Sequence, residues 1–183
     1  MQGAHRHSVP KLALWSLALA LWLVVGRSSF AFGWSLIDAK IRHDFPQVKA
    51  IAPAKLAAWL EDPAQPKPVL LDVRTRAEYD VSHLAGAQHV EPDAPASAIS
   101  APKDRPIVTY CSVGYRSGGF AQRLQAAGYI HVQNLDGSIF HWANEGRPLY
   151  RDSVRVEKVH PYNRTWGLLL QKQRRAEMAA FKP

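Results

Sequence analysis

The chain has 183 residues, a formal net charge of +8 and a single cysteine. Its length suits one domain with a hydrophobic core and is too short for two. The positive charge sits at the ends, because residues 1–31 carry three basic and no acidic residues and residues 151–183 carry eight basic and three acidic. Residues 32–150 carry twelve of each sign. A neutral body argues against a nucleic-acid-binding protein.

Residues 1–31 are predicted to be a signal peptide. A basic start is followed by an apolar run over residues 12–26, which is shorter than the roughly 20 residues that span a membrane. Ser29 and Ala31 occupy the small-residue positions that a signal peptidase reads, so cleavage is expected after Ala31. The protein would then be periplasmic or secreted. The alternative is an uncleaved anchor that holds the protein on the periplasmic face of the inner membrane.

Residues 32–48 are interpreted as a lead-in that packs on the domain or stays mobile. An amphipathic pattern predicts a helix over 51–60, and an apolar run after a proline-rich loop predicts a buried strand over 69–73. Thr75 and Glu78 form a capping box that starts a short helix. A short strand is expected over 88–90, and a weak helix is expected from Asp93.

The second half of the body alternates strands and helices. A strand over 106–110 leads through a glycine-bearing turn into a helix over 117–128, and a strand over 131–135 precedes a short helix within 136–146. This alternation predicts an α/β fold with a mostly parallel sheet that has helices on both faces. Ligands bind such sheets at the carboxyl ends of strands, where Cys111, Asp72 and Arg74 lie.

Cys111 is the candidate nucleophile, because an unpaired cysteine in an exported chain is a candidate reactive thiol. The loop "CSVGYR" can wrap backbone N–H groups around the sulfur, with a helix start behind it and Arg116 at its rim, and all three favour the thiolate. Gly114 permits the tight turn. The alternative is a buried cysteine that acts as a small hydrophobic residue.

Other site motifs do not fit this chain. The surroundings of Ser117 do not match G-x-S-x-G, and neither a Walker loop nor H-E-x-x-H occurs in the sequence. A thioredoxin-like pair would need a second cysteine. The sequence therefore predicts no metal site and no cofactor.

The body resembles a single-domain rhodanese over residues 45–150. The resemblance rests on three blocks in order, namely "LLDVRTRAEYDVSHLAGAQHV", the loop "YCSVGYRS" and "NLDGSIFHWANEGRPL". The chain departs from the family pattern at Ser82 and Ser138, where glycine is common, and neither residue is expected to touch the nucleophile. His83 and Trp142 match family positions and are expected to support the fold.

The resemblance implies a three-layer rhodanese-like fold over residues 49–150, with a central five-stranded sheet. It also implies thiosulfate:cyanide sulfurtransferase-like chemistry, in which Cys111 takes sulfane sulfur from a small donor as a persulfide and passes it to a thiophilic acceptor or a protein acceptor. The C-x₄-R spacing is one residue shorter than in related phosphatases and favours sulfur transfer. The site residues implied are Cys111 and Arg116 as the catalytic pair, Ser112, Val113, Gly114, Tyr115 and Ser117 in the loop, and Asp72 and Arg74 in support.

Several roles stay open at the level of the sequence. Asp72 either accepts hydrogen bonds from loop amides or only ends its strand, and Arg74 either steers anions to the pocket or is merely solvated. With only Arg116 basic in the loop, a persulfide or polysulfide donor is favoured over thiosulfate. Residues 151–183 form a basic tail, interpreted as an amphipathic helix that binds a membrane surface or a partner, or docks on its own domain. The competing functions are a non-catalytic sulfur-carrier or interaction module and a redox-sensing thiol.

Overall fold

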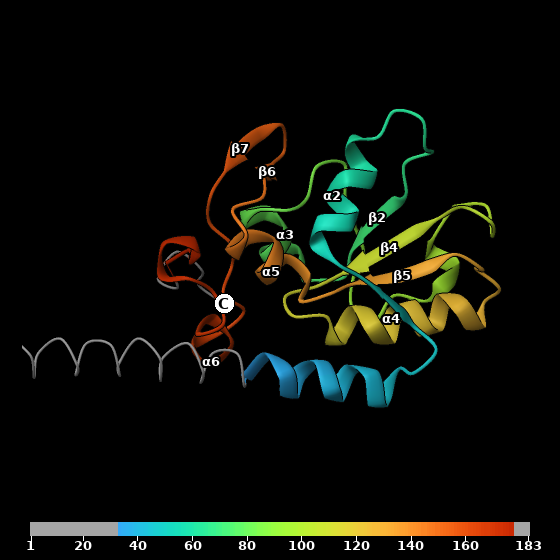
Figure 1. The fold of residues 1–183 in the computed structure, drawn as a ribbon, viewed down its shortest axis with the longest axis horizontal. Coiled ribbons are helices and arrows are strands. Elements are labelled where there is room, and N and C mark those ends of the chain that lie inside the picture. Colours follow the sequence, from blue (N-terminus) through green and yellow to red (C-terminus); the bar gives the residue numbers. More distant parts are fainter. Residues whose placement is uncertain (1–32, 178–183) are drawn as a thin grey trace, which may run out of the picture.

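The computed structural model describes residues 33–177 of the chain (Figure 1). The predicted signal peptide, its cleavage after Ala31 and the alternative anchor all fall outside the described residues. None of the helices within residues 33–177 is long and apolar enough to cross a membrane.

The centre of the fold is a five-stranded sheet in the order β1-β5-β4-β2-β3, in which every neighbouring pair is parallel. The strands are β1 (Lys49–Ile51), β2 (Val69–Asp72), β3 (Gln88–His89), β4 (Ile107–Tyr110) and β5 (Val132–Leu135). The predicted α/β fold with a central parallel sheet is therefore confirmed. The sequence does not predict β1, because three residues directly before a helix that starts with proline carry too short a pattern.

Apolar side chains pack on both faces of the sheet. Leu70 and Val108 belong to one buried cluster, whereas their neighbours Leu71 and Ile107 belong to another. Successive side chains of a strand point to opposite faces, so the two clusters lie on opposite sides of the sheet. A short continuous apolar run such as "VLL" therefore places apolar side chains in the core on both faces of the sheet.

Helices cover the two faces (Figure 1). They are α2 (Pro53–Glu61), α3 (Arg76–Val81), α4 (Tyr115–Ala126) and α5 (Ser138–Asn144), with a single 3-10 turn at Ala96–Ala98 where a weak helix was expected. The first cluster contains Leu56 of α2 and Ile139 of α5, and the second contains Phe120 of α4. The predicted capping box is confirmed, since Thr75 and Glu78 bond reciprocally at the start of α3.

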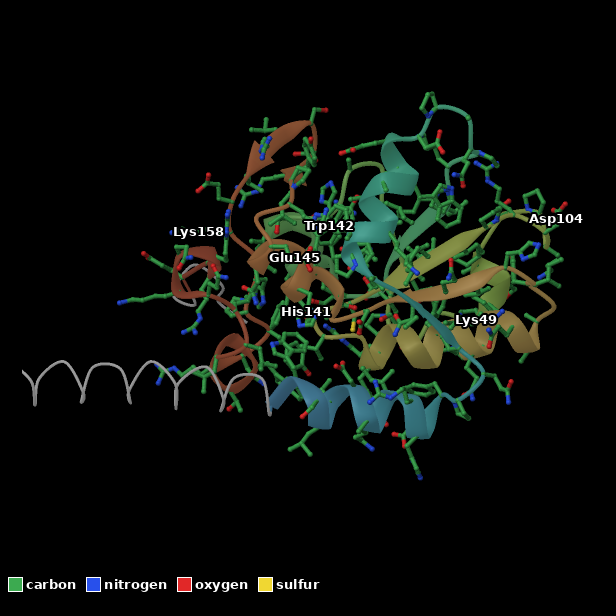
Figure 2. All side chains as sticks on the ribbon, in the orientation of Figure 1. Lys49, Asp104, His141, Trp142, Glu145 and Lys158 are labelled. Carbon is green, nitrogen blue, oxygen red and sulfur yellow. The ribbon has the colours of Figure 1, made fainter. Side chains whose placement is uncertain are left out.

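Residues 33–44 are helical and pack on the domain, so the lead-in is part of the fold. Trp34 is 5% exposed and belongs to the first cluster. Its ring lies 3.8 Å, centroid to centroid, from that of His141, which lies on the side of α5 toward the helix at residues 33–44 (Figure 2). Phe45, just after the helix, contacts Gly118 of α4.

Residues 151–177, the described part of the C-terminal tail, do not form the single amphipathic helix that their composition suggested. A hairpin of β6 (Leu149–Arg151) and β7 (Val154–Val156) is followed by a one-turn helix, α6 (Arg164–Gly167), and a 3-10 turn at Lys172–Arg174. The helix does not continue past this segment, because the side chain of Asn144 in α5 hydrogen-bonds the backbone there. Its Nδ2 donates to Leu169 O, and its Oδ1 accepts from Gln171 N. Leu170, 1% exposed, is held in the first cluster.

Candidate functional site

Cys111 follows directly on β4 at the carboxyl edge of the sheet and is 1% exposed. The backbone N–H of Gly114 donates to its Sγ at 3.2 Å. Gly114 has φ of 108°, a left-handed conformation that glycine adopts readily. The reversal that it allows starts α4 at Tyr115, two residues earlier than predicted, so the first turn of this helix lies immediately beside the thiol.

Ser138 contacts Cys111, contrary to the expectation from the sequence. Its Oγ accepts a hydrogen bond of 3.1 Å from the backbone N–H of Cys111. The contact arises because the turn between β5 and α5 lies under the Cys111 loop, where Ile139 N–H also donates to Cys111 O. A glycine at position 138 would leave this side-chain contact unmade.

Arg116 makes a bidentate ion pair with Glu78 from the N-terminal half of α3. The two N–H···O distances are 2.8 and 2.7 Å, and Glu78 is 2% exposed. Burial acts to raise the pKa of Glu78, but the hydrogen bonds and charge of Arg116 outweigh it and lower this pKa to about 2. Burial likewise disfavours the Arg116 cation, yet Glu78 holds the pKa of Arg116 above its usual value.

Glu78 lies at the site, although the sequence predicts only its role in the capping box. Besides its capping bonds with Thr75 and its pair with Arg116, it accepts a hydrogen bond of 2.8 Å from Ser112 Oγ. The capping-box spacing identified the helix start, but it gave no sign that the same carboxylate reaches the loop 34 residues further on. Glu78 thus ties α3 to both Ser112 and Arg116.

Asn134, at the end of β5, holds the other side of the loop. Its Nδ2 donates to Gly114 O at 2.9 Å, and its Oδ1 accepts from Ser117 Oγ at 2.7 Å. The hydroxyl of Thr109 in β4 donates to Ser117 O at 3.1 Å. Ser117 is fully buried, so it positions the loop from below.

Asp72 and Arg74 pair with each other and not with the loop. Arg74 Nε and Nη2 donate to the two carboxylate oxygens of Asp72 at 2.8 and 2.6 Å, and Nη2 also donates to Ser82 O. The Arg74 side chain is 0% exposed. The prediction that Asp72 accepts hydrogen bonds from loop amides is therefore wrong, and so is the prediction that Arg74 steers anions to the pocket. Each of these charged groups is buried and bound to the other.

A pocket of about 450 Å³ opens over Cys111. Its lining comes from the helix at residues 33–44 (Leu36, Ile37 and Lys40), from the loop and the start of α4 (Cys111, Ser112, Val113, Tyr115 and Arg116) and from the C-terminal residues Tyr162 and Trp166. Tyr115 donates its hydroxyl to Asp44 at 2.7 Å, which fixes its ring at the rim. The five residues from the flanking segments had no predicted role in the site.

The chemistry available in this pocket is that of one sulfur nucleophile. A thiol at the base of an open pocket, with a backbone N–H donor on its sulfur, can attack an electrophilic sulfur or carbon through its thiolate. Within residues 33–177 no group of three or more His, Cys, Asp or Glu side chains is placed to hold a metal ion.

Comparison with known proteins identifies a family. The model of the rhodanese-like domain matches residues 52–145. A sulfurtransferase of Allochromatium vinosum is 38% identical over 89 residues, which cover 44% of this chain and 77% of that protein. The thiosulfate sulfurtransferase GlpE of Pseudomonas fluorescens is 33% identical over 97 residues, which cover 52% of this chain and 85% of that protein.

A larger relative shares only this domain. The probable adenylyltransferase/sulfurtransferase MoeZ of Mycobacterium tuberculosis is 34% identical over 105 residues, and the match spans 25% of its length. Among solved structures, a rhodanese-like domain from Anabaena sp. superposes with a TM-score of 0.51 at 28% identity and covers 57% of this chain and 81% of its own. A rhodanese-like domain protein from Staphylococcus aureus gives a TM-score of 0.50 at 26% identity and covers 56% of this chain and 97% of its own.

Proposed function

The chain belongs to the rhodanese-like domain family, and we propose that it is a sulfurtransferase that carries sulfane sulfur as a persulfide on Cys111. The observation that carries this proposal is the placement of Cys111 Sγ, 3.2 Å from the N–H of Gly114 and at the floor of a pocket. A structural cysteine would need neither the left-handed turn nor the opening above it.

The reaction that we propose has two displacements. In the first, the Cys111 thiolate attacks the outer sulfur of a donor, the sulfur–sulfur bond of the donor breaks, and the donor leaves with the bonding pair, as sulfite from thiosulfate or as a thiolate from a persulfide. In the second, a thiophilic acceptor attacks the outer sulfur of the Cys111 persulfide and the thiolate is regenerated. No external oxidant or reductant enters either step.

The surroundings of the thiol support both displacements. The Gly114 N–H and the first turn of α4 stabilise negative charge at the sulfur before attack and after release. Arg116 is fixed at the pocket wall by Glu78 and Ser112, so its position does not depend on the substrate. We propose a persulfide or polysulfide as the physiological donor, because this single paired arginine offers thiosulfate little attraction.

We also propose that the protein is exported. The support is the sequence of residues 1–31, with its basic start, apolar run and small residues Ser29 and Ala31. N-terminal sequencing of the protein from the cell envelope is expected to begin at Phe32. A chain that still begins with Met1 would contradict cleavage and favour the anchor.

Steady-state kinetics test the sulfurtransferase proposal. With thiosulfate as donor and cyanide as acceptor, thiocyanate formation is expected to show the parallel double-reciprocal lines of a ping-pong mechanism. Cys111→Ser is expected to reduce the rate to background, whereas Ser153→Ala, in the exposed turn between β6 and β7, is expected to leave it unchanged. Intersecting lines, or activity retained by Cys111→Ser, would refute the proposal.

A further inference from the structure

Half of the residues that line the pocket over Cys111 lie outside the matched rhodanese-like domain. The family model ends at residue 145 and begins at residue 52, yet the pocket is also lined by Leu36 and Ile37 on one side and by Tyr162 and Trp166 on the other. These four side chains are apolar or aromatic. They therefore lie outside the matched domain, where the part of a sulfur donor beyond its reacting sulfur would lie.

The two cations of the lining are already paired. Lys40 Nζ lies 2.8 Å from Asp44 Oδ2, and Arg116 is bound through both its terminal nitrogens to Glu78. The local charge is therefore balanced pair by pair. A small inorganic dianion gains little from such a wall, because each positive charge is compensated at hydrogen-bond distance.

Tyr162 is held in an unusual conformation over the site. Its φ is 64°, which non-glycine residues adopt rarely, and its ring centroid lies 4.8 Å from Cζ of Arg116. The side chain remains 44% exposed, so it is not kept there by burial in the core. A backbone conformation of this kind persists only where the surrounding structure fixes it, and such residues cluster at active sites and ligand-binding sites.

We propose that Leu36, Ile37, Tyr162 and Trp166 bind the organic group of an apolar sulfur donor, an aryl or branched-alkyl persulfide, and so make the protein select against thiosulfate. This inference rests on the proposed function, since it assumes sulfur transfer through Cys111. A pocket of about 450 Å³ is far larger than thiosulfate needs and lies within the range of about 300–1,000 Å³ typical of sites for small organic ligands.

Two thiosulfonates provide matched probes of the organic group. In each, the Cys111 thiolate attacks the terminal sulfur, the bond between that sulfur and the sulfonyl sulfur breaks, and a sulfinate leaves with the bonding pair. Benzenethiosulfonate and methanethiosulfonate carry the same charge and the same reacting group, and they differ only in the ring. Each rate constant is divided by that for the same donor with free cysteine, which removes intrinsic reactivity.

The measurement is the second-order rate of persulfide formation on the full-length protein, followed by intact mass. The normalised rate constant for benzenethiosulfonate is expected to exceed that for methanethiosulfonate by about tenfold or more, equivalent to about 1.4 kcal/mol. Thiosulfate is expected to react more slowly than either.

Substitutions in the pocket lining test whether these side chains cause the preference for benzenethiosulfonate. Tyr162→Gly removes the ring and suits the left-handed backbone, and Leu36→Ala shortens a side chain that is 55% exposed, so both are expected to fold. Each is expected to lower the benzene-to-methane ratio several-fold. Tyr162→Phe keeps the ring and is expected to retain the ratio, as is Leu168→Ala, whose side chain is exposed and does not line the pocket.

The outcomes separate this inference from the proposed function. A normalised ratio near one in the unaltered protein, or a ratio that survives both Tyr162→Gly and Leu36→Ala, would overturn the inference while sulfur transfer still stands. Failure of all three donors to load sulfur on Cys111 would instead refute the proposed function, and the inference with it.

Discussion

The thiol of Cys111 is positioned by residues from four different elements. Gly114 before α4 donates to the sulfur, and Ser138, the first residue of α5, accepts from the backbone of Cys111. Asn134 near the end of β5 donates to Gly114 O, and Glu78 of α3 binds Arg116. Single contacts of this kind contribute on the order of 1 kcal/mol each, and more when a partner is charged and buried. The position of the thiol therefore depends on the packing of these elements at the edge of the sheet and not on the loop alone.

Glu78→Gln is expected to destabilise the protein in a pH-dependent way. The pKa of Glu78 lies at about 2 in the folded protein, against 4.5 for the free side chain, a depression worth about 3 kcal/mol. Because the folded-state pKa is lowered, this stabilisation is present above pH 4.5 and is lost as the pH falls toward 2. In urea titrations, the difference in unfolding free energy between the unaltered protein and Glu78→Gln should therefore be largest above pH 4.5 and shrink as the pH falls toward 2.

Asp80→Asn is the matched control for Glu78→Gln. Asp80 lies on the same helix and pairs with Arg76 at 2.7 Å, but both side chains are more than half exposed. Exposed pairs contribute about 0–1 kcal/mol, so a small effect at every pH is expected. A Glu78→Gln difference that does not change between pH 7 and pH 3 would contradict the role assigned to the ion pair.

Elements with strong local patterns could be predicted from the sequence, whereas those fixed by distant partners could not. The apolar run before Cys111, the capping box at Thr75 and the C-terminal glycine of α4 are local signals, and the structure confirms the strand and helices that they indicate. Strand β1 exists because β5 pairs with it. The contact of Ser138 with Cys111 likewise depends on a turn 27 residues away in sequence.

Two adjacent glycines of α4 should respond differently to alanine. A Cβ on Gly118 would lie 2.7 Å from Cδ2 of Phe45, whereas one on Gly119 would come no closer than 3.5 Å to Phe45. Gly118→Ala is therefore expected to cost about 1–2 kcal/mol, because the Phe45 ring must move. Gly119→Ala is expected to stabilise by up to about 1 kcal/mol through helix propensity. Equal effects in thermal unfolding would contradict the close packing between Phe45 and α4.

At the scale of the whole molecule, the segments that flank the matched domain complete its core. Trp34, Val159 and Leu170 are all buried in the first cluster, together with residues of α2 and α5. The apolar side chains that suggested a membrane or partner surface are thus engaged at least in part with the domain itself. The membrane-surface and partner roles of residues 151–183 stay predictions from the sequence.

Leu170→Ala tests whether the C-terminal segment belongs to the cooperative fold. Leu170 is 1% exposed, and removal of a buried leucine side chain costs about 2–5 kcal/mol. Leu168, two residues earlier, is 64% exposed, so Leu168→Ala should change stability by no more than about 0.5 kcal/mol. Similar unfolding midpoints for Leu170→Ala and the unaltered protein would show that the segment is not part of the folding unit.

Sulfur transfer is tested by the intact mass of the protein after brief exposure to a sulfane donor, measured alongside Cys111→Ser. Sulfur transfer through Cys111 predicts a gain of one sulfur atom, its loss on addition of cyanide with an equivalent amount of thiocyanate formed, and no gain in Cys111→Ser. An unchanged mass with thiosulfate, thiosulfonates and a persulfide alike, or a gain that persists in Cys111→Ser, would show that Cys111 does not carry the sulfur.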